Sequence, residues 1–233
     1  MTRVEKVFVT EHILEVRHGA LGSFLDVRGF VADYIRDSGF LPHWTIENTV
    51  VVFRDKPEKP ETETCFTGYK SFGYTTYNPP TKNFFQDRAN SFVALILKNK
   101  HYSIPSITRF GCRTKVFIPC DIDFDDLNRA IYEKFFTQTF RDYIGYKKSD
   151  LQIVSEFKDK GFSARISFGP MHKEEVKAHL SFDSEHFSKV GLYFDIDYFK
   201  IEDVATSKLQ ATLKEAMNII WTKIDGITHI LGV

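Results

Sequence analysis

The tripeptide Asp-Ile-Asp occurs twice in the chain, first with Asp121 and Asp123 and again with Asp195 and Asp197. Both copies border apolar runs that are typical of β-strands, and side chains two residues apart on a strand point to the same face. Paired carboxylates bind Mg²⁺ in enzymes that transfer phosphoryl groups, because hard cations prefer anionic oxygen ligands. One interpretation of the four carboxylates is therefore the metal site of a Mg²⁺-dependent nucleotidyl or phosphoryl transferase.

A second interpretation of the tripeptides needs no metal. Each copy lies near the end of an apolar strand and precedes a segment with a helical pattern, where Asp stabilises free backbone N–H groups and the helix dipole. Asp123, Asp125 and Asp126 all fall at or near the start of one predicted helix. No glycine-rich phosphate loop accompanies the carboxylates. Helix capping and solvated strand ends are the favoured interpretation, and the metal site is the alternative.

A stripe of basic residues is the strongest candidate for binding an anion. The segment 107–118 alternates strictly and places Arg109, Arg113 and Lys115 on one side of a strand. Cations on one strand face recur about every 6–7 Å, which is near the phosphate repeat of a nucleic-acid strand. An acidic protein surface is the other anionic contact that this stripe could make. A competing interpretation is that nearby acids, such as those of the helix starting at Asp123, neutralise it.

Composition and motifs exclude several classes of protein. Lys plus Arg equals Asp plus Glu at 31 each, so any nucleic-acid binding should be weak and local. No HExxH, GxSxG, P-loop or GxGxxG motif is present, and no cofactor is expected. The three cysteines include no CxxC pair, which favours a reducing cytoplasm. No apolar run approaches the roughly 18 residues of a membrane span, so the chain is expected to be soluble and not to bind membranes.

Periodicity predicts an α+β fold with a mostly antiparallel sheet, two or three packed helices and a long C-terminal helix. Helices are expected at 23–38, at 124–138 and from Ser207 onward, where Ser207 and Gln210 have capping-box spacing. Strands are expected at 4–16, 65–77, 107–118 and 190–199, with hairpins at 45–54 and 151–168. The apolar run at 90–98 fits either a strand or a helix. We expect one compact domain, 1–233, whose repeated order of elements suggests two related halves, 1–105 and 106–233.

Two stretches of the chain resemble a known group of proteins. The segment "ITRFGCRTKVFIP" at 107–119 resembles a central strand with an Arg, a Gly and a second Arg. The segment from "GLYFDIDYF" to the terminal "GITHILG" resembles a strand with two aspartates followed by a long helix. Both features are similar to those of a sporadically distributed bacterial family of uncharacterised proteins of similar length. The resemblance implies this architecture and supplies no activity.

No complete set of catalytic residues is evident, so the sequence favours a binding or regulatory protein without enzymatic activity. Aromatic residues between 66 and 85 are expected to be exposed and to anchor an interface. The partner would be another protein or a second copy of the chain. The transferase using Asp121, Asp123, Asp195 and Asp197, and a weak nucleic-acid-binding module, are the alternatives.

Overall fold

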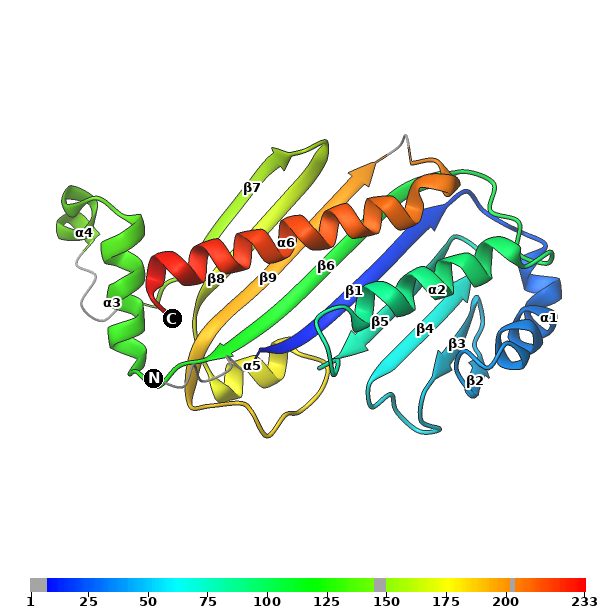
Figure 1. Cartoon of the computed structure of the whole chain (residues 1–233), viewed down its shortest axis with the longest axis horizontal. Helices are drawn as coiled ribbons and strands as arrows, with labels where there is room; N and C mark the ends of the chain where they lie inside the picture. The colour runs from blue at the N-terminus through cyan, green and yellow to red at the C-terminus, as the bar shows by residue number, and fades with distance from the viewer. Residues whose placement is uncertain (1–7, 145–149, 202–203) are drawn as a thin grey trace.

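The computed structural model describes residues 8–144, 150–201 and 204–233 (Figure 1). Across this described part, nine strands form one sheet in the order β2-β3-β4-β5-β1-β6-β9-β8-β7, and all neighbours are antiparallel. The strands are β1 (Val9–His18), β2 (His43–Ile46), β3 (Val50–Arg54), β4 (Glu63–Gly68), β5 (Ser71–Tyr77), β6 (Ile107–Pro119), β7 (Ile153–Asp159), β8 (Phe162–His172) and β9 (Val190–Ile201). The predicted α+β class and antiparallel sheet are confirmed. Residues 4–7 of the first expected strand lie outside the described residues.

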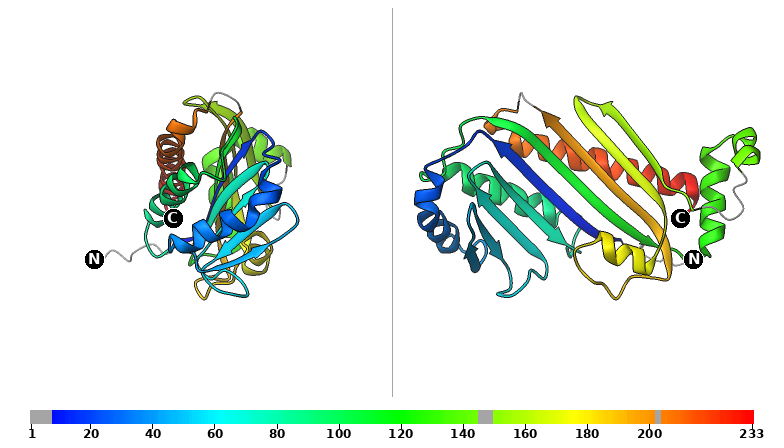
Figure 2. Two further views of the ribbon diagram at one scale, coloured as in Figure 1. Left: turned by 90° about the vertical axis from the view of Figure 1, so that its right-hand side faces the viewer. Right: turned by 180° about the vertical axis from the view of Figure 1, so that it is seen from behind.

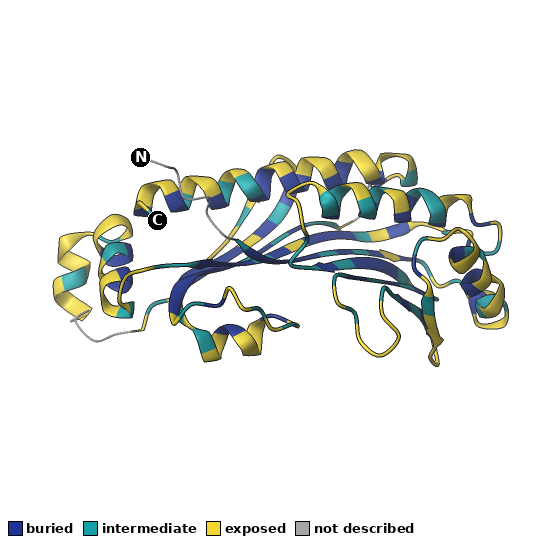
Figure 3. Cartoon of the chain, turned by 60° about the horizontal axis from the view of Figure 1, so that its bottom comes forward, coloured by how far each residue is buried: buried dark blue, intermediate teal, exposed yellow. Residues whose placement is uncertain are grey.

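Helices flank this sheet on both faces and at both ends. They are α1 (Phe24–Asp37), α2 (Phe84–Lys98), α3 (Phe124–Phe135), α4 (Gln138–Ile144), α5 (Lys173–His179) and α6 (Leu209–Leu231). The two longest, α2 and α6, lie on the same face (Figures 2 and 3). Helix α2 packs on β5, and the long C-terminal helix α6 packs on β6 and β9. Helix α5 lies on the opposite side of the sheet, while α1 and α3 lie at its two ends (Figures 1, 2 and 3). The long C-terminal helix is confirmed, and the described helices outnumber the two or three expected.

Three element boundaries differ from the predictions. The expected strand at 65–77 is the hairpin of β4 and β5, because its alternation of apolar and small residues continues through the turn at Tyr69 and Lys70. The ambiguous run at 90–98 belongs to α2, whose buried residues recur at helical spacing. The expected helix at 124–138 ends at Phe135, and α4 starts a new helix at Gln138.

Two turn and cap predictions also need correction. The sequence predicts that the hairpin at 151–168 turns at Lys158, Asp159 and Lys160. The hairpin of β7 and β8 instead turns at Lys160 and Gly161, both with positive φ, so only the last of the three predicted residues takes part in the turn. A two-residue turn in which both residues have positive φ matches the right-handed twist of the two strands that it joins. Ser207 does not cap α6, because Thr206–Lys208 forms a short 3-10 helix and Lys208 occupies the N-cap position.

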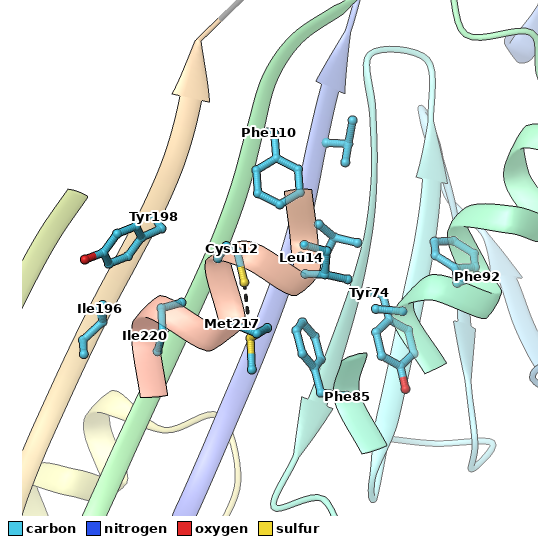
Figure 4. Packing of buried hydrophobic residues seen from close by; sticks show 14 of the residues in the cluster. Leu14, Tyr74, Phe85, Phe92, Phe110, Cys112, Ile196, Tyr198, Met217 and Ile220 are labelled. Carbon is cyan, nitrogen blue, oxygen red and sulfur yellow. Dashed lines mark hydrogen bonds between the residues drawn. The ribbon is translucent and has the colours of Figure 1, made fainter. Parts of the chain in front are cut away.

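The core lies between the sheet and the helices α2 and α6. Met217 and Ile220 of α6 face Cys112 and Ile196 of the sheet (Figure 4), and the sulfur atoms of Met217 and Cys112 are 3.5 Å apart. Each fully buried large apolar side chain contributes about 1.5–3 kcal/mol to stability. None of the described helices combines the length and the apolar character that crossing a membrane requires.

Candidate functional site

The candidate site lies on the open face of the sheet, which we define as the face opposite α2 and α6. Side chains alternate along β6, so Arg109, Arg113 and Lys115 reach this open face while Phe110 and Cys112 are buried beneath α6. Figure 3 shows that α5 is the described helix that packs on this side of the sheet. The fold therefore brings the three predicted cations together on one surface.

Each of these cations meets a carboxylate. Arg113 donates two hydrogen bonds to Asp195, with distances of 2.7 Å from Nε and 2.5 Å from a terminal nitrogen. Arg109 bonds Asp197 at 3.0 Å and lies 3.5 Å from Glu15. The stripe of cations is therefore matched by acids from β1 and β9.

Glycine allows Arg109 to take this position. A Cβ atom at Gly111 would collide with the guanidinium of Arg109, so the absence of a side chain lets the guanidinium lie flat against the sheet. The guanidinium also lies over the ring of Phe199, 5.0 Å from its centroid. Arg109 is consequently fixed by the two carboxylates and by an aromatic ring.

Lys115 joins the central strands to the end of α5. Its ammonium lies 3.4 Å from the carboxylate of Glu11 and donates a hydrogen bond of 2.8 Å to the carbonyl of His179. Glu11 is 2% exposed and also accepts hydrogen bonds from the backbone N–H and the hydroxyl of Ser181, at 3.0 and 3.1 Å. The pair of Glu11 and Lys115 is thus a buried link between strands and helix.

The source of the neutralising acids differs from the one considered in the sequence. The competing interpretation predicts neutralisation by nearby acids and names the helix that begins at Asp123 as one source. The ion pairs are present, and their acids lie on β1 and β9. Two of them, Asp195 and Asp197, form the second Asp-Ile-Asp. This second copy lies in the middle of β9, so the expectation that it marks a strand end is wrong.

Burial and charge act in opposite directions on the pKa of the Asp197 carboxyl group. Burial raises the pKa of Asp197, while the guanidinium groups of Arg109 and Arg113 partly lower it. The hydrogen bonds to Asp195 raise the pKa of Arg113. A carboxyl whose proton affinity is raised is a candidate acid or base, but here its nearest partners are arginines.

The first Asp-Ile-Asp lies elsewhere. Asp121 and Asp123 follow the end of β6 and are exposed, and Asp123 is the N-cap residue of α3 without a side-chain capping bond. Pro119 pairs with Gly191, so the first copy lies beyond the strand end and the second lies several residues inside β9. Among the described residues, no group of three or more His, Cys, Asp or Glu side chains could hold a metal ion.

The expected exposure of the aromatics between 66 and 85 is wrong, because all seven are buried or half-buried. Phe72, Tyr74 and Phe85 are fully buried in the core, because the strand alternation and the helix α2 turn them toward it. Phe66 and Tyr77 are half-buried on the open face. These two are therefore the aromatics of this segment that a ligand on the open face can reach.

His12 was not among the candidates from the sequence. It lies on the helix side of β1, where Nδ1 is 3.0 Å from the hydroxyl of Thr114 and the ring contacts Phe85 and Trp221. Burial lowers the pKa of His12 to about 3, so the imidazole is neutral. The burial of His12 could not be predicted from the sequence, because a single histidine in an alternating strand does not show which face is covered. The acids Glu11 and Glu15 of β1 could have been predicted to lie on the same face as each other, because both occupy odd positions of the strand.

Part of the open face is covered. A second apolar cluster joins α5 and the segment after it to the sheet, and its buried members are Val9, Phe117, Val176, Leu180, Phe187 and Tyr193. The uncovered part holds the ion pairs of Arg109 and Arg113 and half-buried apolar residues that include Ile13, Phe66 and Phe199.

Searches found no match to the chain among protein-family models, curated proteins or solved structures.

Proposed function

We propose that the chain is a binding protein without enzymatic activity that receives a protein partner on the open face of its sheet. The observation that carries the proposal is the combination of neutralised ion pairs with half-exposed apolar side chains. Protein interfaces combine apolar contacts with paired polar groups in this way, and arginine and aromatic residues are enriched in them. The partner is a second protein or another copy of the chain.

The two alternative functions have less support. A Mg²⁺ ion at Asp195 and Asp197 would compete with guanidinium groups, and Asp121 and Asp123 lie too far along the sheet to complete its ligands. Nucleic-acid phosphates would compete with Glu15 and Asp197 for Arg109. This competition lowers the binding free energy that a phosphate contact could contribute.

Mutation of one ion pair on the open face tests the proposal. The partner is first identified by cross-linking from a photoreactive residue at Ile201, which is 65% exposed, with the same residue at Glu215 of α6 as a control. The dissociation constant for the purified partner is then measured by calorimetry. The double substitution Arg113→Ala/Asp195→Ala keeps the net charge and should weaken binding at least tenfold, because it removes a fixed polar contact from the interface.

The matched control is Arg129→Ala/Asp126→Ala, which removes an exposed Arg–Asp pair of α3. It should change the dissociation constant less than twofold. Equal effects of the two double substitutions, or cross-links only from Glu215, would overturn the proposal. Sedimentation of the chain alone shows whether the partner is a second copy.

We also propose that 1–105 and 106–233 are related halves. The order strand, helix, three paired strands, helix fits both β1–α1–β3–β4–β5–α2 and β6–α3–β7–β8–β9–α6. Strand β2 is an addition to the first half, and α4, α5 and the short 3-10 helix Thr206–Lys208 are additions to the second. The sheet supports this arrangement, because β1 pairs with β6 at the centre and β5 and β9 flank them symmetrically.

Side chains support the same relation. Tyr74 of β5 bonds Glu63, which pairs with a cation from α2, and Tyr198 of β9 bonds Asp159, which pairs with Lys223 of α6 at 3.1 Å. Superposition of the central strands of the two halves tests the relation. Helix α1 should fall on α3, and a position on opposite faces of the sheet would refute it.

A further inference from the structure

A groove on the open face lies between two segments that are distant in sequence. Its walls are the loop 56–62 between β3 and β4 and the segment 181–183 after α5, and its floor is formed by Tyr77 and Asn78 at the end of β5. The groove has a volume of about 650 Å³, which is within the range of binding pockets for small ligands and peptides.

The first wall is held in place by one carboxylate. Asp55 accepts hydrogen bonds from the backbone N–H groups of Glu61 and Thr62 at 2.9 and 2.7 Å, and from that of Glu63 at 3.3 Å. The backbone N–H of Tyr77 donates to the carbonyl of Thr62 at 2.8 Å, which joins the wall to the floor. A wall that is already ordered reduces the entropy lost on binding.

The second wall is held by Glu11. Its carboxylate accepts both hydrogen bonds from Ser181, and the ring of Phe182 contacts Tyr77 edge to face at 5.9 Å. Phe182 also contacts Phe187 of the cluster beneath α5. The aromatic side of the groove is therefore fixed to the sheet and to α5.

The groove offers hydrogen-bond acceptors. No backbone hydrogen bond among the described residues uses the carbonyl groups of 56–60, and Pro57 and Pro60 have no N–H to donate. The hydroxyl of Tyr77 has no hydrogen bond within the described part of the chain. A ligand rich in donors, such as an extended peptide backbone, complements these groups.

The lining of the groove carries a small excess of acids. It holds Glu58, Glu61 and Asp183 against Lys56 and Lys59. Lys56 is paired with Glu61 at 3.2 Å, and Asp183 lies 3.9 Å from Lys177 of α5. A cation in the groove would therefore meet Glu58 and the exposed Asp183, whose pair with Lys177 is long and open to solvent. The rings of Tyr77 and Phe182 add surfaces on which a cationic side chain can lie.

We propose that this groove binds an extended segment of the protein partner that carries Arg or Lys between apolar residues. The inference rests on the proposed function, because it names the part of the partner that the open face recognises. The fixed walls supply shape, the loop carbonyls bind the peptide N–H groups, and the acidic and aromatic lining selects the cation.

Peptide titration followed by nuclear magnetic resonance tests the groove on the full chain. The probe is the capped peptide Gly-Leu-Arg-Leu-Gly, and the comparison peptide has Glu in place of Arg. The Arg peptide should shift the amide signals of Asn78 and Phe182 with a dissociation constant on the order of 1 mM, and the Glu peptide should not. Equal shifts with both peptides, or shifts outside the groove, would overturn the inference.

Variants with matched charge changes complete the test. Glu58→Lys/Asp183→Lys should weaken binding of the Arg peptide at least tenfold, whereas Glu133→Lys/Glu215→Lys, which changes exposed acids on α3 and α6, should change it less than twofold. Equal weakening by both variants refutes the inference. One outcome is that the partner binds Glu58→Lys/Asp183→Lys with unchanged affinity and loses affinity only for Arg113→Ala/Asp195→Ala. That result refutes the inference about the groove and leaves the proposed function intact. If the groove binds the peptide and no protein partner exists, the proposed function fails.

Discussion

Removal of the Glu63 carboxylate should be among the most destabilising substitutions of a polar residue in this chain. Glu63 is 8% exposed at the start of β4 and accepts a hydrogen bond of 2.5 Å from the hydroxyl of Tyr74. It accepts two more from Arg88 of α2, at 2.9 and 2.7 Å. Arg88 also donates to the carbonyl of Phe40 and lies 4.1 Å from the centroid of its ring. One carboxylate thus connects β4, β5, α2 and the segment before β2.

The substitution Glu63→Ala leaves the Tyr74 hydroxyl and the guanidinium of Arg88 without their acceptor. Removal of one partner from a fully buried ion pair costs about 3–5 kcal/mol. The Arg88 side chain is 30% exposed, so water recovers part of this loss, and we expect about 2–3 kcal/mol. Urea unfolding followed by circular dichroism measures the change in the free energy of unfolding.

The control is Glu156→Ala, which removes an acid that is 77% exposed and lies 3.7 Å from Arg165. It should cost under about 0.5 kcal/mol. In a double-mutant cycle, Glu63→Ala and Arg88→Ala together should cost less than the sum of the single substitutions, because both break the same contact. Additive costs, or a cost of Glu63→Ala within error of the control, would refute the reasoning.

Three further predictions concern pH, metal and thiols. Burial lowers the pKa of His12 from 6.5 to about 3, so below pH 6.5 the unfolded chain binds a proton that the folded chain excludes. Unfolding free energy should therefore fall by about 2 kcal/mol between pH 6.5 and 5, and His12→Phe should flatten this fall in urea titrations. Calorimetry should detect no micromolar Mg²⁺ binding, and binding that Asp195→Ala abolishes would restore the transferase alternative. Burial raises the pKa of Cys65 and Cys112, so a thiol reagent at pH 8 should label only Cys120 in the folded chain, and prompt labelling of all three thiols would contradict this.

Local pattern determined what could be read from the sequence. The strict alternation of 107–118 identifies β6 and the side on which Arg109 and Arg113 lie, because a strand has a period of two residues. The helix at 23–38 is equally legible from its apolar spacing and agrees with α1 to within one residue at each end. Both features depend on residues that are close together in the chain.

Pairing across the sheet could not be read in this way. Arg113 and Asp195 are 82 residues apart, and Lys115 and Glu11 are 104 apart. Their contact depends on the register of β6 with β9 and β1, which arises from tertiary packing. Alternation alone places each charge on a face of the strand without identifying its neighbour. The sequence therefore predicts that acids neutralise the stripe but does not identify Glu15, Asp195 and Asp197 as those acids.

The two Asp-Ile-Asp tripeptides show how position in the sheet decides the chemistry of a short motif. After the end of β6, Asp121 and Asp123 are exposed to solvent, and Asp123 occupies the N-cap position of α3, where a carboxylate stabilises the helix dipole. In the middle of β9 the same spacing places Asp195 and Asp197 beside the arginines of β6, which take up the oxygens that a metal would need. A carboxylate with a guanidinium as its nearest partner orders a surface. Under the proposed function, the balanced charge of this surface means that a partner is recognised by the fit of its contacts more than by net charge.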